Sequence, residues 1–284
     1  MSIKGRIFHS ICSDIRLMEE FLEIAKKAAK QAGSVLMDHM GKVEVREKNP
    51  RDLVTAADIA SQELIEKLIT THFPDHEFLG EESGGDSGAT SSHSGGGSLK
   101  GEYTWIVDPL DGTTNFVHQL RSFSVSIALI HNGKPIVGVV HDPWCDECFH
   151  AIEGQGAFLN EKQIGVSKCK RLHDAMVVTG FSTSVTKNSI EASRFVEMLG
   201  KAQTIRRLGS AALNLCFLAC GRVDAYWATN LNAWDIAAGM LIQQEAGGHL
   251  RPIQAEFDLF QPEFVAASTP DLASEIFSVI DISE

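Results

Sequence analysis

Residues 105–116 read Trp-Ile-Val-Asp-Pro-Leu-Asp-Gly-Thr-Thr-Asn-Phe, and this stretch says most about the fold. Its apolar start predicts a strand that ends at Asp108. The turn that follows supplies a second carboxylate at Asp111, so two anionic ligands and the carbonyl of Leu110 can converge on a hard cation such as Mg²⁺. Gly112 permits close approach of the backbone, and the amides and hydroxyls after it can face a phosphate if a short helix begins there.

The same motif is also compatible with an ordinary turn, and the other acidic residues have ordinary interpretations as well. Asp, Pro and Gly in this order favour a type I turn on conformational grounds alone. Glu81 and Glu82 follow a strand-like segment, where α/β enzymes carry ligands, but they also suit the start of a solvated loop. Asp235 opens a helix as a partner of its dipole, and Asp58 forms a capping-box pattern with Thr55.

The composition is that of a globular protein with an acidic surface. The chain has 284 residues, 44% of them hydrophobic, and 25 Lys+Arg oppose 37 Asp+Glu for a formal net charge of −12. This surface makes nucleic-acid binding unexpected, because it repels phosphate backbones. An acidic cluster can attract an anionic substrate only by holding cations, which indicates a metal site. The N-terminal residues resemble neither a signal peptide nor a membrane span, so we expect a cytoplasmic protein without membrane association.

Apolar periodicity predicts an α/β fold with layered α+β character. Segments 17–40 and 55–72 have the spacing of amphipathic helices. A mostly antiparallel sheet is expected in the first half, from strand-like segments over 76–79, 103–107, 122–129, 136–140, 147–152 and near 158. A mixed sheet is expected in the second half, from strands over 176–179, 224–227 and 264–267 and helices over 189–199, 210–220, 234–246 and after 270. We place the division between the halves at residues 160 and 161.

Two segments carry alternatives that the sequence leaves open. Residues 83–98 are rich in Gly and Ser and gain little from burial, so we expect a flexible surface loop, either a passive insertion or a mobile lid. Cys145 and Cys148 have the spacing of a redox pair or half a zinc site, but no second pair accompanies them. We interpret them as ordinary hairpin cysteines that stay reduced.

Taken in order, the motifs resemble those of the inositol monophosphatase family, whose members are Mg²⁺-dependent, lithium-sensitive phosphatases. The matching segments are 52–58, 80–83, 108–118, 154–157, 209–212 and 234–239. The resemblance implies an αβαβα sandwich, hydrolysis of a phosphate monoester by a metal-activated water, and a homodimer as the usual assembly. Residues 1–160 would carry most of the metal ligands, and residues 161–284 would contribute Asp235 and the substrate side.

The resemblance also implies three sets of site residues. The expected metal ligands are Glu81, Asp108, the carbonyl of Leu110, Asp111 and Asp235. The expected catalytic residues, which orient and deprotonate the attacking water together with a metal, are Asp58, Glu81 and Thr113. The expected substrate-binding residues are Glu81, Leu110, Asp111, Gly112, Thr113, Gly209, Ser210, Ala211 and Asp235, with the phosphate held by the amides of 112–113 and the alcohol side lined by 209–211.

One departure from the family pattern concerns the substrate. Members acting on inositol phosphates commonly carry a Glu seven residues before the Trp-Asp aspartate, and the matching position here is Ala228, with Asn230 and Asn232 as alternative contacts. We expect a small phosphorylated polyol as substrate, first of all myo-inositol monophosphate, with histidinol phosphate and fructose 1,6-bisphosphate as alternatives. Two other classes stay open: a regulatory protein that keeps the phosphatase fold but acts through a partner, and a Ca²⁺-stabilised structural domain.

Overall fold

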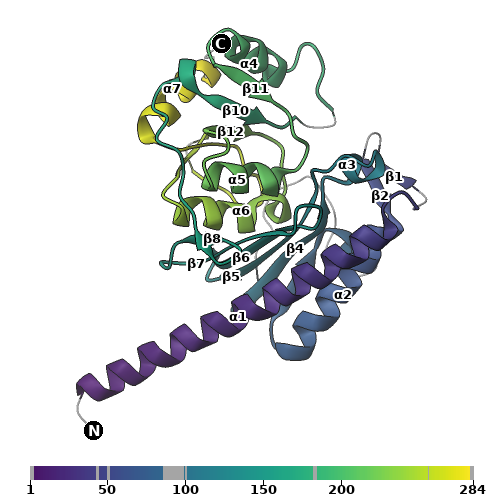
Figure 1. Ribbon diagram of the computed structural model, residues 1–284, viewed down its shortest axis with the longest axis vertical. Helices are drawn as coiled ribbons and strands as arrows, with labels where there is room; N and C mark the ends of the chain where they lie inside the picture. The colour runs from purple at the N-terminus through teal and green to yellow at the C-terminus, as the bar shows by residue number, and fades with distance from the viewer. Residues whose placement is uncertain are drawn as a thin grey trace.

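Five layers of helices and sheets alternate in the computed structural model, which describes residues 3–42, 45–49, 52–85, 99, 101–181, 184–254 and 256–281. Two long helices cover one face of a large sheet, a second helix pair separates this sheet from a smaller one, and a third pair covers the outer face of the smaller sheet (Figure 1). This order confirms the expected αβαβα sandwich.

The large sheet has seven strands in the order β3-β4-β5-β6-β7-β8-β9. β3 and β4 pair in parallel, and every other neighbouring pair in this sheet is antiparallel, as expected for the first half of the chain. The strands are β3 (Glu77–Gly80), β4 (Tyr103–Asp111), β5 (Ser124–His131), β6 (Lys134–Asp142), β7 (Glu147–Ile152), β8 (Ala157–Leu159) and β9 (Lys162–Gln163).

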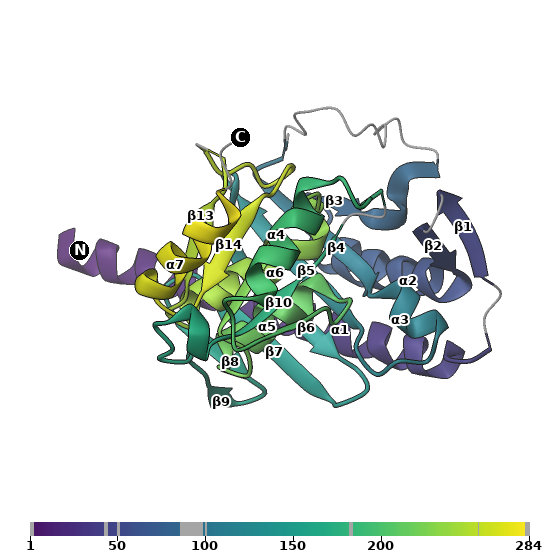
Figure 2. The ribbon, with the colours of Figure 1, turned by 90° about the horizontal axis from the view of Figure 1, so that it is seen from above.

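Two helices, α1 (Ile3–His39) and α2 (Ala56–His72), lie side by side against this sheet (Figure 2). Small buried residues of α1, among them Ala25, Ala28 and Ala32, allow the helix to approach the strands closely. α1 begins at Ile3, earlier than the predicted start at residue 17. The prediction missed this part of the helix because polar residues interrupt the apolar period there. Gly41 follows its end with φ +76°, a conformation that glycine adopts without strain.

The small sheet has five strands in the order β11-β10-β12-β14-β13 and is mixed, as expected. β10 is parallel to β11 and β12, whereas β14 is antiparallel to β12 and β13. Its strands are β10 (Met176–Thr179), β11 (Thr204–Arg206), β12 (Ala225–Ala228), β13 (His249–Pro252) and β14 (Phe264–Ala267). The helices α5 (Ala211–Ala219) and α6 (Ala233–Glu245) form the middle layer, and α4 (Ile190–Leu199) and α7 (Pro270–Ile280) form the outer layer.

Several short elements were not predicted from the sequence. These elements are brief and lack a clear apolar alternation. They are the hairpin of β1 (Val45–Asn49) and β2 (Asp52–Thr55), the strands β9, β11 and β13, and the 3₁₀ turn η2 (Leu172–Asp174). A 3₁₀ turn, η1 (Glu81–Gly85), opens the segment expected to be a loop, and the rest of that segment, residues 86–98, lies outside the described residues. Among the described helices, none has both the length and the apolar character needed to cross a membrane.

The two sheets succeed each other along the chain. The large sheet ends at Gln163 and the first strand of the small sheet begins at Met176. The middle helices nevertheless come from the second half and pack against the large sheet through residues such as Ala237 and Leu241. The two halves therefore share one interior, and the division at residues 160 and 161 stays a prediction.

Candidate functional site

Asp108 and Asp111 lie on the same face of β4 because the strand contains a β-bulge. On a regular strand, residues three positions apart point to opposite faces. Here Asp108 pairs with Ser126 and Asp111 pairs with Ser124, so three steps along β4 match two steps along β5. Pro109 has no N–H to contribute to the ladder, which suits a bulge. The extra residue thus brings both carboxylates together.

α2 supports this bulge and contributes a third acidic residue. Ser61 Oγ donates a hydrogen bond of 2.8 Å to the carbonyl of Pro109. Asp58 Oδ2 accepts from the backbone N–H of Thr55 at 2.8 Å and from its hydroxyl at 2.7 Å, which completes the capping box. The other oxygen, Oδ1, accepts from the hydroxyl of Thr113 at 3.3 Å. The cap and the expected catalytic pair therefore use different oxygens of one carboxylate.

Glu81 lies next to Asp108 because of the parallel pairing of two strands. β3 ends at Gly80, which pairs with Val107 of β4, so that Glu81 and Asp108 follow on adjacent strands in the same direction. The charge of Glu81 is among the causes that raise the pKa of Asp108. The sequence predicted Glu81 at the end of a strand, and the register of β3 and β4 shows that its neighbour is Asp108.

Asp235, at the start of α6, lies near Glu81 and Asp111. Its Oδ2 accepts a hydrogen bond of 2.7 Å from the backbone N–H of Asn232, as a residue in the first helical turn commonly does. Ser126 Oγ donates to the carbonyl of Trp234 at 3.3 Å. Since Ser126 is the cross-strand partner of Asp108, this bond anchors the start of α6 beside the bulge.

Neighbouring carboxylates add to the effect of burial on the pKa of Asp108 and Asp235. Burial raises the pKa of Asp108 well above its ordinary value, and repulsion by Glu81, Asp111 and Asp235 adds to it. Burial, with repulsion by Asp111 and Glu81, raises the pKa of Asp235 to about 8. A cluster of buried and half-buried carboxylates that disfavours its own ionisation gains from a divalent cation, and carboxylate and carbonyl oxygens are hard donors. The donor set therefore fits Mg²⁺.

Asp111 is also held by the start of α5, a contact that the sequence did not reveal. Its carboxylate accepts hydrogen bonds from Ser210 Oγ at 2.5 Å and from the N–H groups of Ala211 and Ala212 at 3.1 and 2.8 Å. Ser124 Oγ adds a fourth contact at 3.5 Å. These donors oppose the effect of burial, which nevertheless raises the pKa of Asp111. Ser210 is fully buried and its hydroxyl faces this carboxylate.

Two glycines and an asparagine bring the loops of the site together. Gly112 has φ +94° and a Cβ at this position would lie 3.0 Å from the carbonyl of Ser122. Gly209 has φ +89°, and a Cβ there would lie 2.7 Å from the amide nitrogen of Asn115. That amide donates to the carbonyls of Ser122 and Leu208, at 2.7 Å each. Gly112 immediately precedes the short helix α3 (Thr113–Val117), as expected.

The position that departs from the family pattern lies in the core. Ala228 is fully buried at the end of β12, among apolar residues that include Phe264. Asn230, with φ +55°, donates from its amide to Glu191 Oε1 of α4 at 3.1 Å. Asn232 caps α6. Both asparagines thus have structural contacts, and Glu191 brings a carboxylate beside the segment that follows Ala228.

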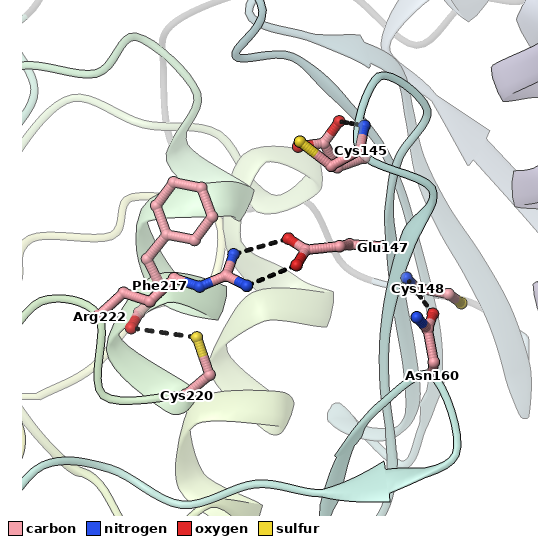
Figure 3. A network of polar contacts seen from close by, with 8 residues as sticks. Cys145, Glu147, Cys148, Asn160, Phe217, Cys220 and Arg222 are labelled. Atoms are coloured by element: carbon pink, nitrogen blue, oxygen red, sulfur yellow. Dashed lines mark hydrogen bonds and ion pairs between the residues drawn. The ribbon is translucent and has the colours of Figure 1, made fainter.

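A separate group of possible metal ligands includes Cys145, the first cysteine of the Cys-x-x-Cys motif. Asp142, Cys145 and Glu147 have ligand atoms within 4.8 Å of one another, in and around the turn between β6 and β7. Glu147 pairs with both terminal nitrogens of Arg222, at 2.5 and 2.6 Å, and Asp142 Oδ1 accepts from the N–H of Cys145 at 3.0 Å (Figure 3). Burial raises the pKa of Cys148 to about 11, which opposes the thiolate of a redox pair.

The metal-free protein is expected to lose stability as pH rises. The folded pKa of Asp235, about 8, lies above the ordinary value of 3.8, so folding takes up a proton between these values. This contribution is complete below the unfolded pKa and disappears as pH rises through about 8. In EDTA, the melting temperature of the wild type minus that of Asp235→Asn should therefore fall from pH 5 to pH 9, roughly the range where the charge forms. A difference that stays flat would contradict the raised pKa of Asp235.

Comparisons with known proteins show which proteins this chain is similar to. The model of the inositol monophosphatase family matches residues 17–283. Inositol monophosphatase 2 of Solanum lycopersicum is 43% identical over 94% of this chain and 100% of its own length. The Nus factor SuhB of Pasteurella multocida is 37% identical over 93% of this chain and 96% of its own. The solved IMPase of Thermotoga maritima has a TM-score of 0.81 at 35% identity, covering 92% of this chain and 97% of that one.

Proposed function

The chain belongs to the inositol monophosphatase family, and from this we propose that it hydrolyses a phosphorylated polyol with the help of Mg²⁺. It is a phosphoric monoester hydrolase, as its relatives named inositol monophosphatase indicate. The proposal rests above all on one observation: four acidic residues meet at the β4 bulge beside the Asp58 and Thr113 pair.

In this proposal the metal ligands are Glu81, Asp108, the carbonyl of Leu110, Asp111 and Asp235. When bound, Mg²⁺ would neutralise the carboxylates and the substrate phosphate, lower the pKa of a bound water and stabilise the leaving alkoxide. The residues around it hold these ligands without any covalent step of their own. Asp108 Oδ1 accepts from the N–H of Leu110 at 3.0 Å, which orients this carboxylate.

Thr113 is the proposed contact to the attacking water. Its hydroxyl has Asp58 Oδ1 at 3.3 Å and the carbonyl of Leu110 at 3.1 Å as acceptors. When the hydroxyl donates to Asp58, a lone pair of Thr113 Oγ1 is left to accept a hydrogen bond from water. Asp58 would then take the proton through Thr113, and Glu81, in the turn that follows β3, would help to orient the water. The phosphate is proposed to bind the amides of Gly112 and Thr113.

The alcohol of the substrate is proposed to lie against residues 209–211 and the start of α6. Ala228 carries the difference from the inositol-specific pattern, since a methyl group in the core cannot accept a hydrogen bond. Myo-inositol monophosphate is the substrate that we favour, and histidinol phosphate and fructose 1,6-bisphosphate are the alternatives. A homodimer, a cytoplasmic location and inhibition by lithium belong to the same proposal.

A substrate panel tests this function. We expect Mg²⁺-dependent phosphate release from myo-inositol 1-phosphate, abolished by EDTA and restored by added Mg²⁺, because the carboxylates repel a phosphate dianion without a cation. Histidinol phosphate, fructose 1,6-bisphosphate, adenosine 3′,5′-bisphosphate and glycerol 2-phosphate complete the panel, and each active reaction is repeated with lithium.

Turnover of only another compound in the panel would change the proposed substrate and would indicate that Ala228 redirects specificity. Silence across the panel, with Mg²⁺ binding shown by calorimetry, would favour a regulatory role. The similarity to proteins named Nus factor SuhB motivates this second candidate. It predicts that the protein retains a partner in stoichiometric amount when purified from its cell.

A further inference from the structure

Gln62 is a buried polar residue of α2 that the expected catalytic machinery does not include. Its side chain is 7% exposed and faces the segment that carries Glu81. Gln62 Oε1 accepts a hydrogen bond of 2.8 Å from the backbone N–H of Glu82, and Nε2 donates to Ser83 Oγ at 3.2 Å. One amide thus contacts both residues that follow Glu81.

The same network closes on the residue before Glu81. Ser83 Oγ accepts a further hydrogen bond of 3.2 Å from the N–H of Gly80. Gln62 lies so close to Gly80 that a Cβ at this position would be 2.2 Å from its Oε1. A side chain at residue 80 would therefore displace the amide from this position. Residues on both sides of Glu81 are therefore linked to α2 through Gln62 and Ser83.

α2 carries two other side chains that hold parts of the site. Asp58 accepts from Thr113, and Ser61 donates to Pro109 in the bulge. Residues three and four positions apart lie on one face of a helix, so Asp58, Ser61 and Gln62 face the site together. Each one contacts a different segment: α3, the β4 bulge and the Glu81 turn. The helix sets the distances between these segments.

We propose that Gln62 is a positioning residue that holds the carboxylate of Glu81 in the metal site. This inference rests on the proposed function, since it assumes that Glu81 is a ligand. A ligand whose neighbouring backbone is held in place loses less conformational freedom when it binds its ion, and hydrogen bonds outside the ligand set affect metal affinity by about 10- to 100-fold. Loss of the amide is therefore expected to weaken Mg²⁺ binding more than it alters the fold.

The test compares Mg²⁺ affinity among variants of the full chain by calorimetry, without substrate. Gln62→Met keeps the length of the side chain and removes both hydrogen bonds, and it should raise the dissociation constant for Mg²⁺ about tenfold. Gln62→Glu restores the acceptor for Glu82, and Ser83 can donate to the carboxylate, so affinity should return toward that of the wild type. Glu63→Met makes the same replacement at an exposed neighbour and should bind as the wild type does.

A merely structural role would lower the melting temperature of Gln62→Met and leave its Mg²⁺ affinity unchanged, and that result would overturn the inference. Absence of Mg²⁺ binding by the wild type would instead overturn the proposed function. If Gln62→Met does not fold, Ser83→Ala breaks the same network outside the helix. This variant should show a smaller loss of affinity in the same direction, and unaltered binding would again contradict the proposal.

Discussion

Asp108→Asn is expected to abolish Mg²⁺-dependent phosphate release and to raise the melting temperature of the metal-free protein. The amide removes one charge from the site, and the loss of several kcal/mol of metal-assisted stabilisation of the transition state corresponds to a rate decrease of about 10³ or more. The same amide keeps an acceptor for the N–H of Leu110. It also removes the repulsion with Glu81, Asp111 and Asp235 that raises the pKa of Asp108.

The rise in melting temperature distinguishes loss of function from loss of fold. For a chain of this size we expect about 2–4 °C for each kcal/mol of repulsion that is removed. The measurement is a thermal scan in EDTA at neutral pH, beside an assay at saturating Mg²⁺. Asp75→Asn, at an exposed position next to β3, is the matched control and should change neither quantity. An active Asp108→Asn enzyme would refute the assignment of this residue to the metal.

Gly112→Ala is expected to cause the largest loss of stability among small changes at the site. Its φ of +94° costs an L-residue about 1–2 kcal/mol. The new Cβ would also meet the carbonyls of Ser122 and Gly209 at 3.0 and 3.3 Å, and backbone atoms cannot turn away as a side chain can. Crowding of this kind adds about 1–3 kcal/mol. Displacement of the following turn would also move Thr113 away from Asp58 and reduce turnover.

Gly133→Ala separates the conformational cost of a positive φ from the cost of crowding by the new Cβ. Gly133 has φ +76° in the turn between β5 and β6, and a Cβ there would meet nothing within 4 Å. This variant should lose only the conformational part, measured as a smaller shift of the midpoint in chemical denaturation. Equal losses in the two variants would show that contact between the loops of Gly112 and Gly209 is unimportant.

The electrostatic prediction and the Gln62 prediction concern different properties of the same ligands. The first concerns charge: burial and neighbouring carboxylates raise the pKa of Asp108 and Asp235, so the metal-free site favours their protonation. The second concerns geometry: Gln62 limits where Glu81 can lie before any ion binds. Both properties favour a divalent cation, and the variants Asp235→Asn and Gln62→Met separate them.

Much of the architecture followed from local patterns. The strands at 147–152, 176–179 and 264–267 were predicted with the bounds that the structure has. The capping box of Thr55 and Asp58 was also predicted correctly. These features depend on alternation and a cap within a few residues, so short-range physics is enough to recognise them.

The sequence also predicted which residues form the candidate site, through the spacing of Asp108 and Asp111 and the resemblance of the motifs. It could not indicate how they meet. Three residues apart on a regular strand, these carboxylates would face opposite ways, and only the pairing with β5 reveals the bulge that unites them. The hydrogen bonds of Asp111 to the start of α5 join residues about a hundred positions apart.

What the sequence determined by itself was therefore the type of each element, the chemical nature of the site and the family. The tertiary structure decided the register of β4 and β5, the position of Glu81 beside Asp108, and the contact of Gln62 with the turn that carries Glu81. Neither a strand register nor a contact between α2 and η1 leaves a periodic signal in the chain. Such features arise only when distant segments pack, because each segment supplies just half of the interaction.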